Sequence, residues 1–246
     1  IIKASHQVEL YDEELKCEPF KKIGIKTLKP FKINKKINKA INQIAEINKK
    51  ILDNKLFPIT LGGEHSITPG CIKPFVKKYK KLTLLHFDAH ADLRESYAGE
   101  KFSHASAIKR CIDHKNVSVV SFGIRNISAE EIPILKKNQK RINIYWAKDK
   151  KKWNLNKFKK QIKNKDVYIT FDVDGLDSSI MPATGTPEPG GIYWNEALEI
   201  IKIACKNSRV VGADVNELAP IKGFNSYNFL VAKLVYKILS YKFLLK

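Results

Sequence analysis

Short apolar runs alternate with longer segments of helical periodicity along most of the chain. The clearest helical segment covers residues 35–54, where isoleucines recur close to every 3.6 residues, the repeat that places them on one helix face. The apolar runs are much shorter, which is typical of strands buried inside a sheet. Strands are therefore predicted over residues 57–61, 82–87, 117–122, 141–146, 167–171 and 210–213.

The alternation of strands and helices predicts an α/β fold with three layers, αβα, around a mostly parallel central sheet. No linker, repeat or low-complexity segment divides residues 1–246, so we expect a single domain. In such sheets, ligands gather beyond the carboxyl ends of the strands. The remaining helices are predicted over residues 68–80, 105–114, 129–138, 155–163, 194–206 and 225–242.

Composition narrows the class of protein. The chain has 246 residues, 43% of them hydrophobic, which is enough for one sizeable core. No apolar run reaches the length of about eighteen residues that a transmembrane helix needs. The four cysteines lie far apart and form no CxxC pair, as expected of reduced thiols in a cytoplasmic protein. The net charge of +20 is spread along the whole chain, which indicates a solvated surface rather than a nucleic-acid footprint.

Potential metal ligands follow three of the predicted strands. Because the carboxyl ends of parallel strands meet at one edge of a sheet, these residues are expected to lie close together. The three segments are Gly62-Gly63-Glu64-His65-Ser66, Asp88-Ala89-His90-Ala91-Asp92 and Asp172-Val173-Asp174-Gly175-Leu176-Asp177.

The spacing of these ligands points to a cation. Asp88, His90 and Asp92 stand at every second position, and so do Asp172 and Asp174. If the preceding strands continue through them, each set projects from one side of its strand. Ligands that face together repel one another and lose hydration unless a cation lies among them. A lone aspartate after a strand is more often a turn or cap residue, but five residues on two strands favour a metal site.

The types of ligand favour manganese. Carboxylates with imidazole and no thiolate suit Mn²⁺ better than structural Zn²⁺, which prefers four tight nitrogen or sulfur ligands. Four carboxylate charges match two divalent ions better than one, and two ions about 3.5–4 Å apart can share a water and lower its pKa. The candidate ligands are His65, Asp88, His90, Asp92, Asp172 and Asp174.

Taken together, the three segments resemble the signatures of the arginase/agmatinase (ureohydrolase) family, in the same order and spacing. The similarity extends over residues 2–239, and several segments are most similar to those of prokaryotic agmatinases. The resemblance implies an arginase-like fold, two Mn²⁺ per chain, and a homo-oligomer, either a trimer or a hexamer. The agmatinase-like segments are Asp92-Leu93-Arg94-Glu95, Phe102-Ser103-His104-Ala105 and Gly185-Thr186-Pro187-Glu188-Pro189-Gly190-Gly191.

The resemblance also implies roles for matching positions. Asp88 and Asp172 would bridge the two ions and so belong to the catalytic residues. One manganese would be held by His65, Asp88, Asp92 and Asp172, and the other by His90, Asp88, Asp172 and Asp174.

Two further residues match functional positions of the family. His104 corresponds to the histidine that transfers protons and contacts the substrate, and histidine side chains titrate near neutral pH. Glu217 corresponds to the glutamate that holds the guanidinium group, which can donate two parallel N–H bonds to one carboxylate. We interpret Asp214 as structural, Asp177 as support for the ligands, and His86 as a structural or surface residue.

The chain departs from the family pattern at its beginning. Family members usually start with a strand before the segment that resembles residues 2–6, and nothing precedes that segment here. Either the sequence is a fragment of a longer protein or the domain lacks the family's N-terminal strand, and we expect the latter. Ser178 and Asn216 replace residues that are commonly proline and apolar, but no departure removes a proposed ligand.

The substrate is the most open question within this family. Arginine would need partners for its α-carboxylate and α-amino groups, yet the segment after Asp92 lacks the polar pattern of arginases. Asn126 also stands where arginases carry an acidic residue. Agmatine, cleaved to putrescine and urea in polyamine biosynthesis, fits better. Guanidinobutyrate or another ω-guanidino compound, arginine included, is the nearest alternative.

A second class of function is a non-catalytic, basic nucleic-acid-binding protein on the same fold. A degenerate family member would be expected to lose ligands, whereas all six are present. We therefore expect a cytoplasmic hydrolase with a small-molecule guanidino substrate, and neither nucleic acid nor a membrane as a partner.

Overall fold

The centre of the structure is a parallel sheet of six strands, in the order β1-β6-β5-β2-β3-β4. The computed structural model describes residues 1–245. Every pairing between neighbouring strands is parallel. The strands are β1 (Ile59–Leu61), β2 (Leu82–Phe87), β3 (Val117–Phe122), β4 (Ile142–Tyr145), β5 (Asp166–Asp172) and β6 (Arg209–Asn216).

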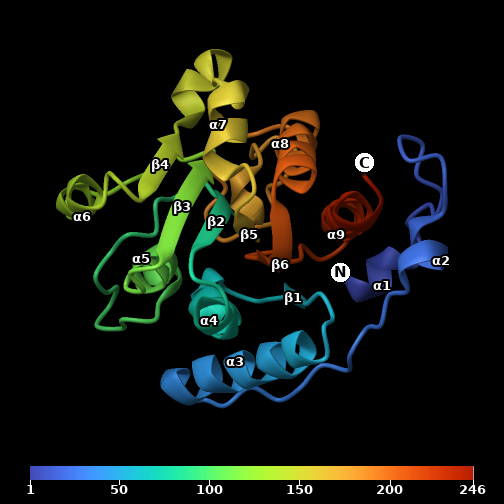
Figure 1. The fold of residues 1–246 in the computed structure, drawn as a ribbon, viewed down its shortest axis with the longest axis horizontal. Coiled ribbons are helices and arrows are strands. Elements are labelled where there is room, and N and C mark those ends of the chain that lie inside the picture. The colour runs from blue at the N-terminus through green and yellow to red at the C-terminus, as the bar shows by residue number, and fades with distance from the viewer. Residues whose placement is uncertain (246) are drawn as a thin grey trace.

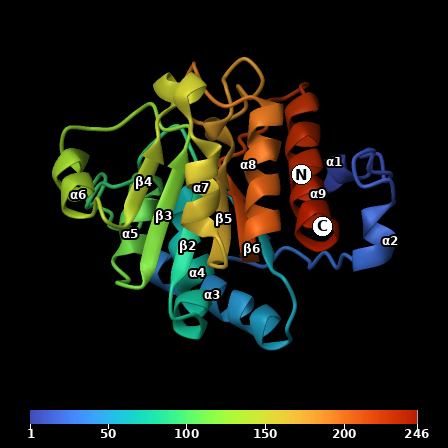
Figure 2. The same ribbon diagram turned by 45° about the horizontal axis from the view of Figure 1, so that its top comes forward.

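Helices cover both faces of this sheet, and Figures 1 and 2 show the layers from two directions. Beyond β4, at the edge of the sheet, lies α6 (Glu131–Lys137). One face carries α3 (Ile37–Asp53), α4 (Thr68–Lys78) and α5 (Ala107–Ile112), and the other carries α7 (Leu155–Ile162), α8 (Trp194–Asn207) and α9 (Ser226–Leu244).

Each face of the sheet has its own apolar core because strand side chains alternate between the two sides. In β2, Leu82 and Leu84 pack in the core that also contains Phe75 of α4. Leu85 and Phe87 pack in the core on the opposite face. Burial on both sides explains why apolar residues dominate both faces of β2. Together with the helices on both faces of the sheet, it confirms the predicted three-layer α/β fold.

The elements differ from the prediction mainly at their ends. β1 begins at Ile59 rather than at residue 57, because Pro58 has no N–H to donate to a neighbouring strand. β5 and β6 extend beyond the predicted runs to Asp172 and Asn216, so polar residues continue both strands. The short helices α1 (Ile2–Ser5) and α2 (Pro19–Ile23) were not predicted, since so few residues show no helical period.

The N-terminal segment runs beside α9 and then continues in an extended path to α3 (Figure 1). Polar contacts tie it to α9. The Tyr236 hydroxyl donates to the Leu10 carbonyl at 2.7 Å. The Lys237 ammonium lies 2.9 Å from Asp12 Oδ2, and neither side chain is more than 2% exposed. Lys237, which interrupts the apolar C-terminal stretch of the sequence, is therefore paired inside the protein and not solvated.

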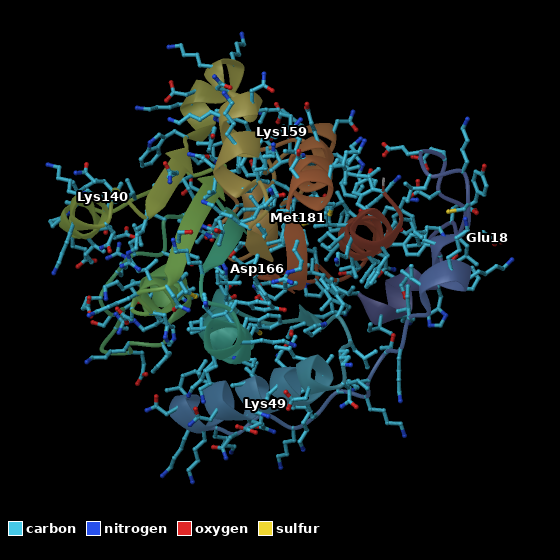
Figure 3. All side chains as sticks on the ribbon, in the orientation of Figure 1. Glu18, Lys49, Lys140, Lys159, Asp166 and Met181 are labelled. Atoms are coloured by element: carbon cyan, nitrogen blue, oxygen red, sulfur yellow. The ribbon has the colours of Figure 1, made fainter. Side chains whose placement is uncertain are left out.

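Three other lysines show that basic side chains occur on several parts of the surface. Lys49 of α3, Lys140 after α6 and Lys159 of α7 lie on separate parts of the surface in Figure 3. Within residues 1–245, none of the helices combines the length and the apolar character that crossing a bilayer requires.

The Asp12–Lys237 pair leads to a prediction about stability. Asp12→Ala leaves the buried ammonium of Lys237 with only Glu13, at 3.3 Å, and should lower the free energy of unfolding by about 3 kcal/mol. Lys202→Ala breaks the half-exposed pair with Glu14 and should cost less than about 1 kcal/mol. Urea unfolding monitored by circular dichroism measures both. Equal losses of unfolding free energy in the two variants would contradict the assignment of Asp12 and Lys237 as a buried, stabilising ion pair.

Candidate metal centre

The candidate ligands lie at the carboxyl edge of four neighbouring strands. β1, β6, β5 and β2 are adjacent in the sheet, and the segments that follow them carry every proposed ligand and Glu217. His65 opens the short helix η1 (His65–Ile67), and Asp174 lies in the short helix η4 (Val173–Gly175). The parallel topology therefore brings together residues that are more than a hundred positions apart in the sequence.

His65 is the centre of the first group of ligands. Its Nδ1 atom lies 3.0 Å from Asp88 Oδ2, 3.1 Å from Asp92 Oδ2 and 3.3 Å from Asp172 Oδ2. His65 is fully buried, yet this nitrogen forms no hydrogen bond of good geometry with any described residue. A buried imidazole nitrogen that faces three carboxylate oxygens without a hydrogen bond fits a cation at their centre.

A second group lies on the other side of Asp88. His90 Nδ1 is 2.9 Å from Asp174 Oδ2 and 3.5 Å from Asp88 Oδ1. Asp88 thus directs one oxygen toward His65 and the other toward His90, as expected of a carboxylate between two ions. Asp172 Oδ1 instead accepts the backbone N–H of Asp174 at 2.9 Å. The two groups together fit a binuclear metal site.

The electrostatics of the cluster also favour cations. Burial raises the pKa of Asp172 well above its ordinary value, and the charges of Asp174 and Asp88 raise it further. Burial and the charge of Asp88 raise the pKa of Asp92 to about 7. Burial also acts on Asp88, but the neighbouring His86, His65 and His90 outweigh it and hold its pKa well below the usual range. The carboxylates repel one another, and divalent cations would relieve that repulsion.

The sequence profile of the Arginase family matches residues 1–240. The chain belongs to the arginase family. It is 32% identical to an N(1)-aminopropylagmatine ureohydrolase of Synechocystis, over 98% of this chain and 80% of that protein. It is 40% identical to an agmatinase of Bacillus anthracis, but over 74% of this chain and only 62% of that protein. The crystal structure of agmatine ureohydrolase of Thermoplasma volcanium superimposes with a TM-score of 0.87 at 28% identity, over 98% and 80% of the two chains. The predicted membership of the ureohydrolases is therefore confirmed.

The path of the backbone through the family's motifs differs from the prediction. The strands do not continue through all of the ligands, since β5 includes Asp172 but ends there. β2 ends at Phe87, and Asp92 has a left-handed backbone with φ 52°. Close approach of two loops brings the ligands together instead. A Cβ atom at Gly175 would lie 2.7 Å from the Asp88 nitrogen, so only glycine lets the segment after β5 pack against the segment after β2.

Glu217 lies directly over the loop that carries His65. Its Oε1 atom accepts the backbone N–H of His65 at 2.6 Å, and its own N–H donates to the Gly63 carbonyl at 2.7 Å. The residue has a left-handed backbone with φ 63°, a conformation that costs about 1 kcal/mol or more and is common at functional sites. Burial raises the pKa of Glu217, while the His65 N–H and the charges of His65 and His104 oppose that rise.

His104 is the most accessible of the proposed site residues. It opens the short helix η2 (His104–Ser106) and is exposed. Its ring centroid lies 5.5 Å from that of Tyr97, at an interplanar angle of 58°. The structure places it outside both ligand groups, in keeping with its interpretation as a non-ligand.

Asp177, the last residue of the third segment, and Arg125 hold the loop that follows that segment. Asp177 accepts the backbone N–H groups of Ser179 at 3.0 Å and Gly191 at 2.7 Å. Burial acts on this carboxyl group, but those donors outweigh it and lower its pKa to about 2. Arg125, which our sequence interpretation passed over, donates to the carbonyls of Asp174 at 2.8 Å and Glu188 at 2.7 Å. The only sequence signal was its place three residues after the buried strand β3.

His86 is the clearest site residue that the sequence interpretation missed. It is fully buried. Its Nε2 atom lies 2.8 Å from Asp88 Oδ2 and its Nδ1 atom 3.0 Å from Ser121 Oγ. His86 therefore supports the carboxylate between the two groups. Its place two residues before Asp88, within the same every-second-residue series, was the available signal.

The cluster leads to a prediction about metal and stability. Mn²⁺ at about 1,000 times its Kd stabilises a protein by roughly 4 kcal/mol, which corresponds to a Tm shift on the order of 10 °C at this chain length. Metal-free wild-type protein should show that shift in differential scanning fluorimetry. Asp88→Ala should lose most of it, because Asp88 faces both histidines. Asp113→Ala, at an exposed aspartate after α5, is the control and should keep it. An unshifted wild-type Tm would contradict the metal centre.

Proposed function

We propose that this chain is an agmatinase-type ureohydrolase that holds two Mn²⁺ and hydrolyses the guanidinium group of agmatine, giving putrescine and urea. The observation that carries the proposal is the position of Glu217, which is hydrogen-bonded to the backbone of the ligand His65. A carboxylate at that place can hold a guanidinium group beside the metal ligands.

The ligand assignment extends the geometry of the two groups. His65, Asp88, Asp92 and Asp172 would hold one ion, and His90, Asp174 and the same two bridging carboxylates would hold the other. When bound, two Mn²⁺ supply a water of lowered pKa as the nucleophile. The mixture of carboxylate oxygens and two imidazoles, without thiolates, supports Mn²⁺ over structural Zn²⁺.

The residues of this chain have separate tasks in the reaction. Glu217 binds the planar guanidinium through paired N–H bonds and orients its carbon toward the ligands. Its carboxylate is restrained by the His65 N–H, so little side-chain freedom is lost on binding. His104, exposed beside Tyr97, would transfer a proton to the departing amine. Asp88 and Asp172 would hold the metal ions in position.

The rim of the site supports a substrate with a positively charged tail. Asn126 pairs with the backbone of His90, and its Nδ2 atom donates to Glu188 Oε1 at 2.7 Å. This contact holds an acidic side chain near the ligand loop. An ammonium tail would be attracted by Glu188, whereas the carboxylate of guanidinobutyrate or of arginine would be repelled. The name of the Synechocystis relative makes aminopropylagmatine a second candidate, because its longer tail is also positively charged and carries one amine more than that of agmatine.

Urea release separates these candidates. The purified chain would be loaded with Mn²⁺, analysed for metal, and assayed with agmatine, aminopropylagmatine, guanidinobutyrate and arginine. We expect two Mn²⁺ per chain and the highest kcat/KM with agmatine. If the protein binds two metal ions but prefers another guanidino compound, only the substrate assignment is wrong. Fewer than two ions with an intact fold would refute the binuclear assignment.

Glu217→Gln tests the guanidinium site. The substitution keeps the shape of the side chain but places an amide N–H₂ near the guanidinium donors. A desolvated, charge-assisted pair is worth on the order of 2–5 kcal/mol, so kcat/KM for agmatine should fall by at least about 30-fold. Manganese content should stay at the wild-type value. Glu199→Gln, on the exposed side of α8, is the matched control. Loss of metal in the Glu217 variant would instead make that residue part of the metal centre.

Glu188→Gln tests the choice of tail. Removing the rim charge should lower kcat/KM for agmatine by about 5- to 10-fold, as expected for a partly solvated charge pair worth roughly 1 kcal/mol. The value for guanidinobutyrate should stay constant or rise, because a repulsive charge is gone. Steady-state kinetics with both substrates give the ratio of the two kcat/KM values. If both values fall together, Glu188 acts on the loop and not on the substrate tail.

A further inference from the structure

The ring nitrogen of His65 that faces away from the ligands is held by a buried chain of hydrogen bonds. His65 Nε2 lies 2.8 Å from Thr170 Oγ1. The Thr170 hydroxyl donates to Asp214 Oδ1 at 2.7 Å. Thr170 and Asp214 are register partners on β5 and β6, and all three side chains are inaccessible to solvent. The chain thus runs from the sheet interior to the first ligand group.

The direction of these hydrogen bonds follows from the environment of Asp214. Its Oδ1 atom accepts from Thr170 at 2.7 Å, from Asn216 Nδ2 at 2.6 Å and from Thr68 Oγ1 at 3.2 Å. The Thr170 hydroxyl has a second possible partner in Thr68 Oγ1 at 3.2 Å, but its contact with Asp214 Oδ1 is much shorter, at 2.7 Å. A carboxylate oxygen accepts and does not donate, so the Thr170 hydrogen is assigned to Asp214. The lone pairs of Thr170 Oγ1 then accept the proton on His65 Nε2.

This direction decides the state of the opposite ring nitrogen. When Nε2 carries the proton, Nδ1 of the neutral ring has a free lone pair. That atom is the one that faces Asp88, Asp92 and Asp172. We propose that Thr170 and Asp214 are positioning residues that hold His65 in the metal-binding tautomer and thereby set the affinity of the ion on the His65 side. The inference rests on the proposed metal centre.

The other histidine ligand has no comparable support. His90 uses Nδ1 toward Asp174 and Asp88, and its side chain is 26% exposed. Within residues 1–245, its Nε2 atom makes no hydrogen bond to a protein group. The two ions should therefore respond differently when the chain is broken. A residue that merely stabilises the sheet would not discriminate between them.

Thr170→Val and Thr170→Ser test the role of the hydroxyl. Valine has nearly the shape of threonine but leaves His65 Nε2 without an acceptor, whereas serine keeps the acceptor. Loss of such a supporting partner typically weakens metal binding by about 10- to 100-fold. Thr83→Val is the matched control. Thr83 is a buried threonine on β2 whose hydroxyl contacts Ser118 at 3.1 Å, away from the ligands.

The measurement is Mn²⁺ binding to the full chain, by isothermal titration calorimetry and equilibrium dialysis, analysed for two sites. Thr170→Val should weaken one of the two sites by about 10- to 100-fold and leave the other within about threefold. Thr170→Ser and Thr83→Val should bind both ions nearly as the wild type does. In urea unfolding of the metal-free proteins, Thr170→Val and Thr83→Val should have similar free energies of unfolding.

Asp214→Asn provides a second, independent variant. An asparagine N–H₂ can donate to Thr170, which would then donate to His65 Nε2 and force the proton onto Nδ1. The same site should weaken, and combining Asp214→Asn with Thr170→Val should add little, because both act through one chain. Wild-type affinities in Thr170→Val, or equal weakening of both sites, would overturn the inference. A wild type that binds fewer than two ions would refute the metal centre itself, and the inference with it.

Discussion

Mutual repulsion among buried carboxylates is the constraint on which the rest of the site depends. Asp88, Asp92 and Asp172 lie around one histidine nitrogen, and Asp174 adds a fourth charge nearby. Without cations, such a group would be among the least stable parts of the protein. The surrounding structure counteracts the repulsion with N–H donors, with His86 behind Asp88, and with two apolar cores that fix the strands from both faces.

The sheet supplies most of the precision that this arrangement requires. Four adjacent parallel strands end at the same level, so short segments suffice to bring the ligands together. The segments after β2 and β5 approach so closely that Gly175 cannot carry a side chain. Arg125 then holds the following loop through backbone carbonyls on both sides of it. Rigid elements position the ligands, and the loops contribute the rim.

The fold, and the meeting of the candidate ligands at one edge of the sheet, could be predicted from the sequence because both depend on local patterns. Apolar runs mark the buried strands, and the acidic and histidine residues directly follow them. What could not be read depends on tertiary contacts. The left-handed backbone at Asp92, the partner of His86 and the hydrogen-bonded chain below His65 have no local signature. Asp214, interpreted as structural, faces Thr170 only because β5 and β6 are neighbours.

One contact links two binding events that are usually treated separately. Glu217 accepts the N–H of His65 and donates its own N–H to the Gly63 carbonyl. The residue proposed for the guanidinium group is thus hydrogen-bonded to the backbone segment that carries a proposed metal ligand. A shift of that segment changes both sites at once. Thermodynamic linkage is reciprocal. If bound metal changes the affinity for a guanidinium ligand by some factor, the bound ligand changes the affinity for metal by the same factor. A guanidinium inhibitor would therefore also act as an effector of metal retention.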